Sequence, residues 1–133
     1  MLNISTRRRE WETVVGTAER EPDVWASVGI HPHEADAHQD LGRAVLLQAT
    51  QHPRVIAIGE TGLDYYWQKD APEWQRERFR THIRAARETG KPLVIHTRSA
   101  AEDTLRLMRE EQAGEAGGVM HCFTESWEVA EAA

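Results

Sequence analysis

The sequence predicts an α/β fold in which helices cover a parallel sheet. Along the 133 residues, short apolar runs alternate about five times with amphipathic segments, and this alternation is typical of parallel sheets. Chemically active side chains follow four of these runs at intervals of roughly 30 residues, close to the length of one unit of a (β/α)8 barrel. Five units cannot close such a barrel. The chain is therefore expected to be either a small open α/β domain or the middle units of a barrel whose two ends are missing.

The first half of the chain contains three predicted strands and two predicted helices. Ser5 and Thr6 are suited to cap the first helix, whose apolar residues recur at spacings of three and four. In the third strand, four aliphatic residues and Gly59 precede Glu60, which lies between Gly59 and Gly62. An aliphatic run of this kind is typical of a strand covered on both faces. In parallel sheets and barrels the functional residues lie at the carboxyl ends of such strands. The predicted strands cover 1–4, 24–31 and 55–60, and the helices lie across 11–18 and 41–50.

The second half continues the alternation. Pro72 favours the first turn of a long helix, which Gly90 is expected to end. Ser99 and Glu102 fit a capping box for the following helix. The residues that this helix is expected to bury are Ala101, Leu105 and Met108. The remaining predicted elements are strands at 93–96 and 119–121 and a last helix beginning near Thr124.

The composition excludes several classes of protein. The formal net charge of −6 argues against a protein that holds nucleic acid by bulk electrostatic attraction, although an enzyme could still meet phosphate through a metal and a few arginines. No apolar run approaches the ~20 residues of a membrane helix, and the N-terminus does not resemble a signal peptide. The single cysteine, Cys122, excludes an internal disulfide and fits a reducing compartment. We therefore expect a cytoplasmic protein without a membrane partner.

Four strand ends carry the residues of a predicted metal site. His31, Glu60, His96 and His121 each end an apolar run close to a loop. Parallel strands bring such ends to the same rim, so residues far apart in the sequence become neighbours. Imidazole and carboxylate together suit Zn²⁺, Mn²⁺ or iron, and a carboxylate-rich site also takes Mg²⁺. Hydrolysis by a metal-activated water is the expected reaction class.

The residues beside these four have open alternatives. His31 precedes Pro32 and His33, and because proline removes a donor and fixes φ, the two imidazoles are not interpreted as a metal-binding pair. His31 is instead expected to contact substrate or support the site, with a purely structural role as the alternative. Arg98 is suited to bind phosphate through both arms of its guanidinium, or it forms a surface ion pair.

Other residues have weaker assignments. The loop after Glu60 holds an acid and two aromatic residues that could orient water or stack on a base, with ordinary packing as the alternative for each tyrosine. Three further histidines are expected to be surface or helix residues, and the five tryptophans are interpreted as packing. These loop residues and histidines are Asp64, Tyr65, Tyr66, His38, His52 and His82.

Four ordered motifs resemble those of a known family, the TatD-type metal-dependent hydrolases or deoxyribonucleases of the amidohydrolase-like barrels. The motifs are Val28-Gly29-Ile30-His31-Pro32-His33, Ile58-Gly59-Glu60-Thr61-Gly62-Leu63-Asp64-Tyr65-Tyr66, Lys91-Pro92-Leu93-Val94-Ile95-His96-Thr97-Arg98 and His121-Cys122-Phe123-Thr124.

The resemblance implies an incomplete TIM-type (β/α)8 barrel, with residues 1–133 forming a single partial domain that lacks the first and last strands of the family. It implies metal-ligand roles for Glu60, as a bridging ligand, and for His96 and His121. It also implies two divalent ions (Mg, Mn or Zn) in a complete protein. The family's opening His-x-His strand and its late Glu-Thr-Asp segment have no counterpart in this sequence.

The resemblance and the residues together predict a DNase-like hydrolase of phosphodiester bonds, with DNA or another phosphoester as substrate. Two alternatives stay open. The chain could be a catalytically incomplete fragment that only binds metal or assembles with other chains, or it could act on a cyclic amide or ester. Open sheet edges also make self-association an expectation.

Overall fold

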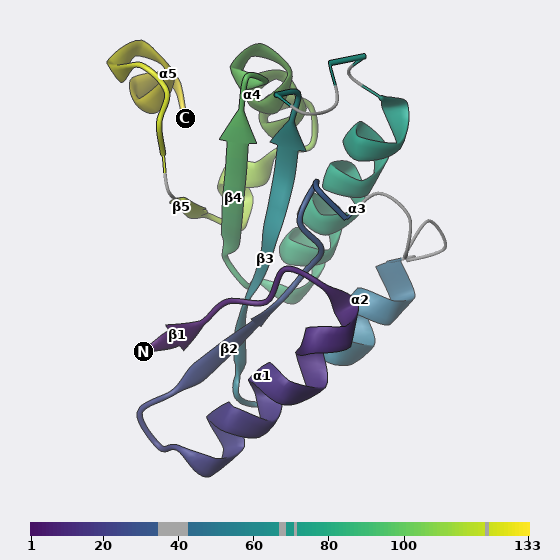
Figure 1. Ribbon diagram of the computed structural model, residues 1–133, viewed down its shortest axis with the longest axis vertical. Helices are drawn as coiled ribbons and strands as arrows, with labels where there is room; N and C mark the ends of the chain where they lie inside the picture. Colours follow the sequence, from purple (N-terminus) through teal and green to yellow (C-terminus); the bar gives the residue numbers. More distant parts are fainter. Residues whose placement is uncertain (35–42, 67–68, 71, 122) are drawn as a thin grey trace.

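The computed structural model describes residues 1–34, 43–66, 69–70, 72–121 and 123–133. Five parallel strands form one sheet in the order β1-β2-β3-β4-β5, which curls as half of a barrel (Figure 1). The strands are β1 (Leu2–Asn3), β2 (Trp25–Val28), β3 (Val55–Asp64), β4 (Leu93–Arg98) and β5 (Gly118–Met120). The helices are α1 (Arg8–Arg20), α2 (Arg43–Ala49), α3 (Glu73–Thr89), α4 (Ala101–Glu110) and α5 (Trp127–Ala132), with a 3₁₀ turn, η1, at Ala113–Glu115. The alternation predicted from the sequence is thus confirmed.

The helices pack along the outside of the sheet, with α1 against β2 and α3 against β3 (Figure 1). The core lies between these layers. Its largest fully buried apolar side chains include Phe79, Ile83, Ile58, Leu63 and Ile30. Because consecutive strands are joined by helices on this side, the carboxyl ends of β2, β3 and β4 reach one rim. No helix among the described residues is long and apolar enough to cross a bilayer.

The two predicted capping motifs are wrong, because the polar side chains make other contacts. Arg7 is the N-cap of α1, whereas the buried hydroxyl of Ser5 donates to the Ser27 carbonyl at 2.8 Å and so ties the chain to β2. Ala100, without a capping side chain, precedes α4. Ser99 has a φ of 53°, outside the geometry of a capping box.

Helix boundaries and buried faces show smaller differences. Pro72 lies one position before α3 as its N-cap, and Gly90 ends that helix in the left-handed conformation as predicted, with φ 70°. The buried residues of α4 are Thr104 and Leu107, and the expected Ala101, Leu105 and Met108 are only half-buried. The last helix begins at Trp127, after the Ser126 cap. The expected start of the helix at 41–50, His38, Trp67 and Cys122 lie outside the described residues.

Strand β3 extends four residues beyond the predicted end at Glu60. Its register with β4 shifts between Gly59 and Thr61, and Gly62 then pairs with His96. A Cβ on Gly62 would lie 1.9 Å from the His96 carbonyl oxygen, and φ is 138° there, so this position requires glycine. The peptide bond between Gly59 and Glu60 is cis. The extension places a second acid, Asp64, at the same rim as Glu60.

Burial of the histidines and tryptophans differs in part from the expectation. His82 lies in a helix, as one of its two expected settings, but it is fully buried rather than at the surface. Trp11 is packed in the core, and its indole N–H donates to the Gly29 carbonyl at 3.0 Å. Trp127, by contrast, is 75% exposed, so packing does not account for it.

Candidate metal centre

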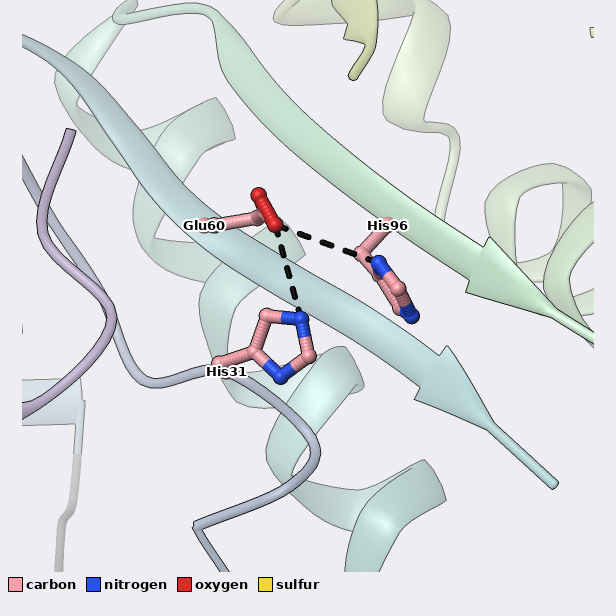
Figure 2. Close-up of side chains that lie close together, drawn as sticks. All are labelled: His31, Glu60 and His96. Carbon is pink, nitrogen blue, oxygen red and sulfur yellow. Dashed lines mark ion pairs between the residues drawn. The ribbon is translucent and has the colours of Figure 1, made fainter. Parts of the chain in front are cut away.

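Glu60 is the centre of the candidate site. Its side chain is only 8% exposed, and imidazole nitrogens surround its two carboxylate oxygens. His121 Nδ1 lies 2.7 Å from Oε2, while His31 Nε2 and His96 Nδ1 lie 3.5 Å and 3.9 Å from Oε1 (Figure 2). The structure therefore brings together all four rim residues predicted from the sequence. Glu60 lies on β3 and His96 on β4, whereas His31 and His121 lie in the segments that follow β2 and β5.

His96 lies between two carboxylates. Its Nδ1 faces Glu60, and its Nε2 lies 2.9 Å from Oδ2 of Asp64. Because the Asp64 carboxylate accepts hydrogen bonds, it favours the tautomer with the proton on Nε2. This leaves the lone pair of Nδ1 directed toward Glu60. A ligating histidine held through its other nitrogen by a carboxylate is a recurrent arrangement in metal sites.

His31 has the opposite pattern. Its Nδ1 accepts the backbone N–H of His33 at 3.1 Å, so the neutral ring carries its proton on Nε2, which points to Glu60. A nitrogen that carries a proton can donate a hydrogen bond but cannot ligate a metal. This geometry supports the predicted role of His31 as a supporting or substrate-contacting group. Burial and the neighbouring His96 and His33 imidazoles lower the pKa of His31 to about 3.

Asp64 and His33 lie in the site, although neither was predicted from the sequence to be a metal-site residue. Nε2 of His33 lies 2.7 Å from the same Asp64 oxygen that contacts His96. The His31 and His33 rings are close, with centroids 4.6 Å apart, yet their Nε2 atoms face different carboxylates. For Asp64 the available signal was its four-residue spacing from Glu60, because side chains four apart along a strand share a face. For His33 it was the His-Pro-His triplet itself.

The Asp64 carboxylate is buried and well supplied with donors. Oδ1 accepts the Tyr66 backbone N–H at 3.0 Å, while Oδ2 faces His33 and His96. Burial disfavours the ionised form, but the hydrogen bonds from these partners outweigh it and lower the pKa of Asp64 below its ordinary value. The ionised carboxylate therefore holds the two imidazoles in place.

Arg98, the last residue of β4, pairs with Tyr66, which lies just after β3. The guanidinium carbon of Arg98 lies 3.8 Å from the centre of the Tyr66 ring, and the Arg98 carbonyl accepts the Tyr65 N–H at 2.9 Å, which joins the ends of β3 and β4. Stacking holds a guanidinium flat while its N–H groups remain directed outward in the plane. Tyr65 is fixed separately, because its hydroxyl donates to Asp103 at 2.9 Å.

The donor set fits a divalent cation. Two groups of side chains have one ligand atom each within 4.8 Å of the others: His31, Glu60 and His96 in one, and His33, Asp64 and His96 in the other. Since Asp64 holds His96 by hydrogen bonding and His31 carries a proton on Nε2, the atoms best suited to coordination are a Glu60 oxygen and Nδ1 of His96. His121 is the third candidate, because its imidazole already contacts Glu60. Mixed nitrogen and oxygen ligands suit Zn²⁺ and Mn²⁺.

A parallel half-barrel with imidazoles gathered around a buried glutamate at its rim defines a class, the metal-dependent hydrolases built on TIM-type barrels. Comparison with known proteins gives the family. The family model described as TatD related DNase matches residues 1–133. The chain therefore belongs to this family, and the resemblance seen in the four motifs is confirmed.

Curated relatives agree with this assignment. The uncharacterized metal-dependent hydrolase YabD of Bacillus subtilis is 43% identical over 107 residues, which are 80% of this chain and 42% of the relative. The uncharacterized metal-dependent hydrolase TatD of Mycobacterium tuberculosis is 46% identical over 116 residues, 84% of this chain and 44% of the relative. A relative from Escherichia fergusonii named 3'-5' ssDNA/RNA exonuclease TatD is 32% identical over 93% of this chain. The chain spans less than half the length of these relatives.

A solved structure supports the fold. The crystal structure of YjjV, a TatD homologue from Escherichia coli K12, superposes with a TM-score of 0.89 at 25% identity, over 98% of this chain and 51% of that one. The incomplete barrel predicted from the sequence is thereby confirmed.

Proposed function

We propose that this chain carries part of the active site of a metal-dependent phosphodiesterase that acts on DNA. The observation that supports it most is the convergence of three imidazoles on the buried Glu60 carboxylate. A buried carboxylate is costly unless it is paired or binds a metal. Imidazole side chains can serve in either case, because they donate hydrogen bonds to a carboxylate and also ligate metals. The name of one relative, an exonuclease for single-stranded DNA and RNA, favours a nucleic-acid substrate.

In this proposal, Glu60, His96 and His121 hold one or two divalent ions, with Glu60 as the shared ligand. When bound, such an ion polarises a phosphoryl oxygen and activates water. Asp64 keeps His96 in the tautomer whose Nδ1 can coordinate. His31 donates from Nε2, either to Glu60 or to a substrate oxygen, and burial keeps this ring neutral.

Arg98 is the proposed phosphate contact. Its guanidinium stacks on the Tyr66 ring, and among the described residues it forms no ion pair, which was the alternative considered for it. A phosphodiester oxygen accepts hydrogen bonds from a guanidinium in a fixed plane. We therefore expect Arg98 to contribute a hydrogen-bonding contact to an anionic phosphodiester group of the substrate.

The proposal is tested with the 133-residue chain and a 3'-labelled single-stranded oligonucleotide in Mn²⁺ or Mg²⁺. We expect metal-dependent release of nucleotides, near background for Glu60→Gln. Glu77→Gln is the control, because Glu77 is an exposed acid on α3 that pairs with Arg80. Equal activity of the wild-type chain and Glu60→Gln would reject the site. Calorimetric Mn²⁺ binding without turnover would support the alternative of a chain that only binds metal.

Two accompanying proposals concern the cellular compartment of the protein and its self-association. The cytoplasm is the proposed compartment, because the one cysteine fits reducing conditions. Self-association is proposed at the sheet edges: β1 and β5 are the outer strands, and Val119 on β5 is 58% exposed. Sedimentation velocity across protein concentrations tests the second proposal, and a concentration-independent monomer would reject it.

A further inference from the structure

Helix α3 buries two polar side chains on its otherwise apolar inner face. Gln75 and His82 are both 0% exposed and share that face with Phe79, Ile83 and Ala86. A separation of seven residues places them on one side of the helix, about 10 Å apart along its axis. Burying a polar group costs free energy unless its hydrogen bonds are remade. The partners of these two side chains therefore matter.

Gln75 binds the end of β3 from both of its amide atoms. The Asp64 backbone N–H donates to Oε1 at 2.9 Å, and Nε2 donates to the Asp64 carbonyl at 3.0 Å. Both bonds go to the backbone of the residue whose carboxylate faces His33 and His96. Gln75 thus fixes the place from which that carboxylate projects.

His82 binds the segment after β2 in a similar way. Its Nε2 accepts the backbone N–H of Ile30 at 3.1 Å, and its Nδ1 donates to the Arg78 carbonyl at 2.8 Å. The second bond fixes the tautomer that the first one needs. Burial lowers the pKa of His82 to about 4, which keeps the ring neutral and able to accept. Ile30 directly precedes His31.

The sheet itself does not join these two segments at the rim. The last register pair of β2 and β3 is Val28 with Ile58, six residues before Asp64. Arg78, between the two buried polar residues on α3, also donates to the Glu34 carbonyl at the end of the His31 segment. Three residues of one helix therefore hold the backbones of two segments beyond the point where the strand pairing ends.

We propose that Gln75 and His82 are positioning residues that set the distance between Asp64 and the His31–His33 segment, and through Asp64 the orientation of His96. A rigid helix with two anchors about two turns apart fixes this distance better than the loops could alone. Apolar side chains would fill the same space without making either connection. The expected effect of Gln75 and His82 on metal affinity rests on the proposed metal site.

The test compares Gln75→Met and His82→Leu, which keep side-chain bulk but remove the hydrogen bonds, with Phe79→Leu on the same helix face. Backbone hydrogen exchange is followed at Asp64 and Ile30, and Mn²⁺ affinity is measured by calorimetry. We expect exchange to rise at least about tenfold at Asp64 in Gln75→Met and at Ile30 in His82→Leu, and Mn²⁺ affinity to fall about tenfold in both. Phe79→Leu should lower stability but leave the affinity nearly unchanged.

His82→Gln is the conservative variant, because its side-chain oxygen can accept the Ile30 N–H, and it should restore most of the affinity. The inference is overturned if the polar variants lose no more Mn²⁺ affinity than Phe79→Leu at equal loss of stability, or if exchange at the two amides does not change. Absence of Mn²⁺ binding by the wild-type chain would instead reject the proposed function. Backbone hydrogen exchange at Asp64 and Ile30, together with changes in the imidazole NMR signals of His33 and His96, would then still show whether Gln75 and His82 position these segments.

Discussion

His96 connects the two acids of the site: its Nε2 lies 2.9 Å from Oδ2 of Asp64, and its Nδ1 lies 3.9 Å from Oε1 of Glu60. The contact with Asp64 favours the tautomer with the proton on Nε2, which leaves Nδ1, on the side of Glu60, free to coordinate a metal. Glu60 and Asp64 belong to the same strand. The imidazole is therefore held by one acid and presented to the other by the geometry of β3 and β4.

Asp64→Asn should weaken divalent-metal binding by about 10- to 100-fold, as is typical when the carboxylate partner of a ligating histidine is removed. Calorimetric titration with Mn²⁺ measures the change. Asp103→Asn is the matched control, because Asp103 accepts the Tyr65 hydroxyl away from the imidazoles. Equal Mn²⁺ affinities in wild type and Asp64→Asn would show that Asp64 does not orient His96.

His121→Ala should reduce Mn²⁺ affinity while leaving the free energy of unfolding within about 1 kcal/mol, because the His121 side chain is 37% exposed. His52→Ala provides the comparison. His52 also faces a glutamate, Glu19, at 2.6 Å, but takes no part in the rim. If both variants bind Mn²⁺ as well as the wild type, His121 is not a ligand.

Arg98→Lys should raise the KM for a single-stranded oligonucleotide more than it lowers kcat, because lysine keeps the charge but loses the planar contact with phosphate. Tyr66→Leu should act in the same direction by removing the ring on which the guanidinium rests. Arg109→Lys, in the last turn of α4, serves as the control. A pure kcat effect in Arg98→Lys would contradict the role in substrate binding.

Gly62→Ala should destabilise the protein by about 3 kcal/mol or more, because its Cβ would overlap the His96 carbonyl oxygen and the backbone has a positive φ. Urea unfolding measures the loss. Gly114→Ala is the control, because a Cβ there meets no atom within 4 Å. A loss no larger than that of Gly114→Ala would mean that the two strands can separate at this point.

The free energy of unfolding should fall as the pH is lowered from 6.5 to 4, because His82 is buried as a neutral imidazole. The pKa of His82 is about 4 in the folded protein, below the ordinary value of 6.5, so the unfolded chain binds the proton first as the pH falls. This residue stabilises the fold fully above pH 6.5, by about 3 kcal/mol, and loses that contribution toward pH 4.

Urea unfolding of wild type and His82→Gln over this range isolates the contribution of His82, because other titrating groups are common to both proteins. Between pH 6.5 and pH 4, the free energy of unfolding of the wild type should fall by about 3 kcal/mol more than that of His82→Gln. A difference that is independent of pH would show that His82 is not kept neutral by folding.

The sequence determined the alternation of strands and helices and the four rim residues His31, Glu60, His96 and His121. Local apolar periodicity fixes the elements, and the rule that parallel strands end at one edge gathers their last residues. Helix caps were predicted wrongly, because Ser5 forms a tertiary hydrogen bond with β2 instead of a local one. Such competition between local and distant partners is invisible in the sequence.

Only the tertiary structure decided which nitrogen of each histidine faces which acid. The register shift at Glu60 and the extension of β3 to Asp64 place His96 between two carboxylates, and the His33 amide fixes the proton on His31. The buried anchors on α3 depend on packing between a helix and segments 11 and 52 residues away. Spacing along the chain specifies strand ends, but directions of hydrogen bonds arise only once the sheet and helices are packed.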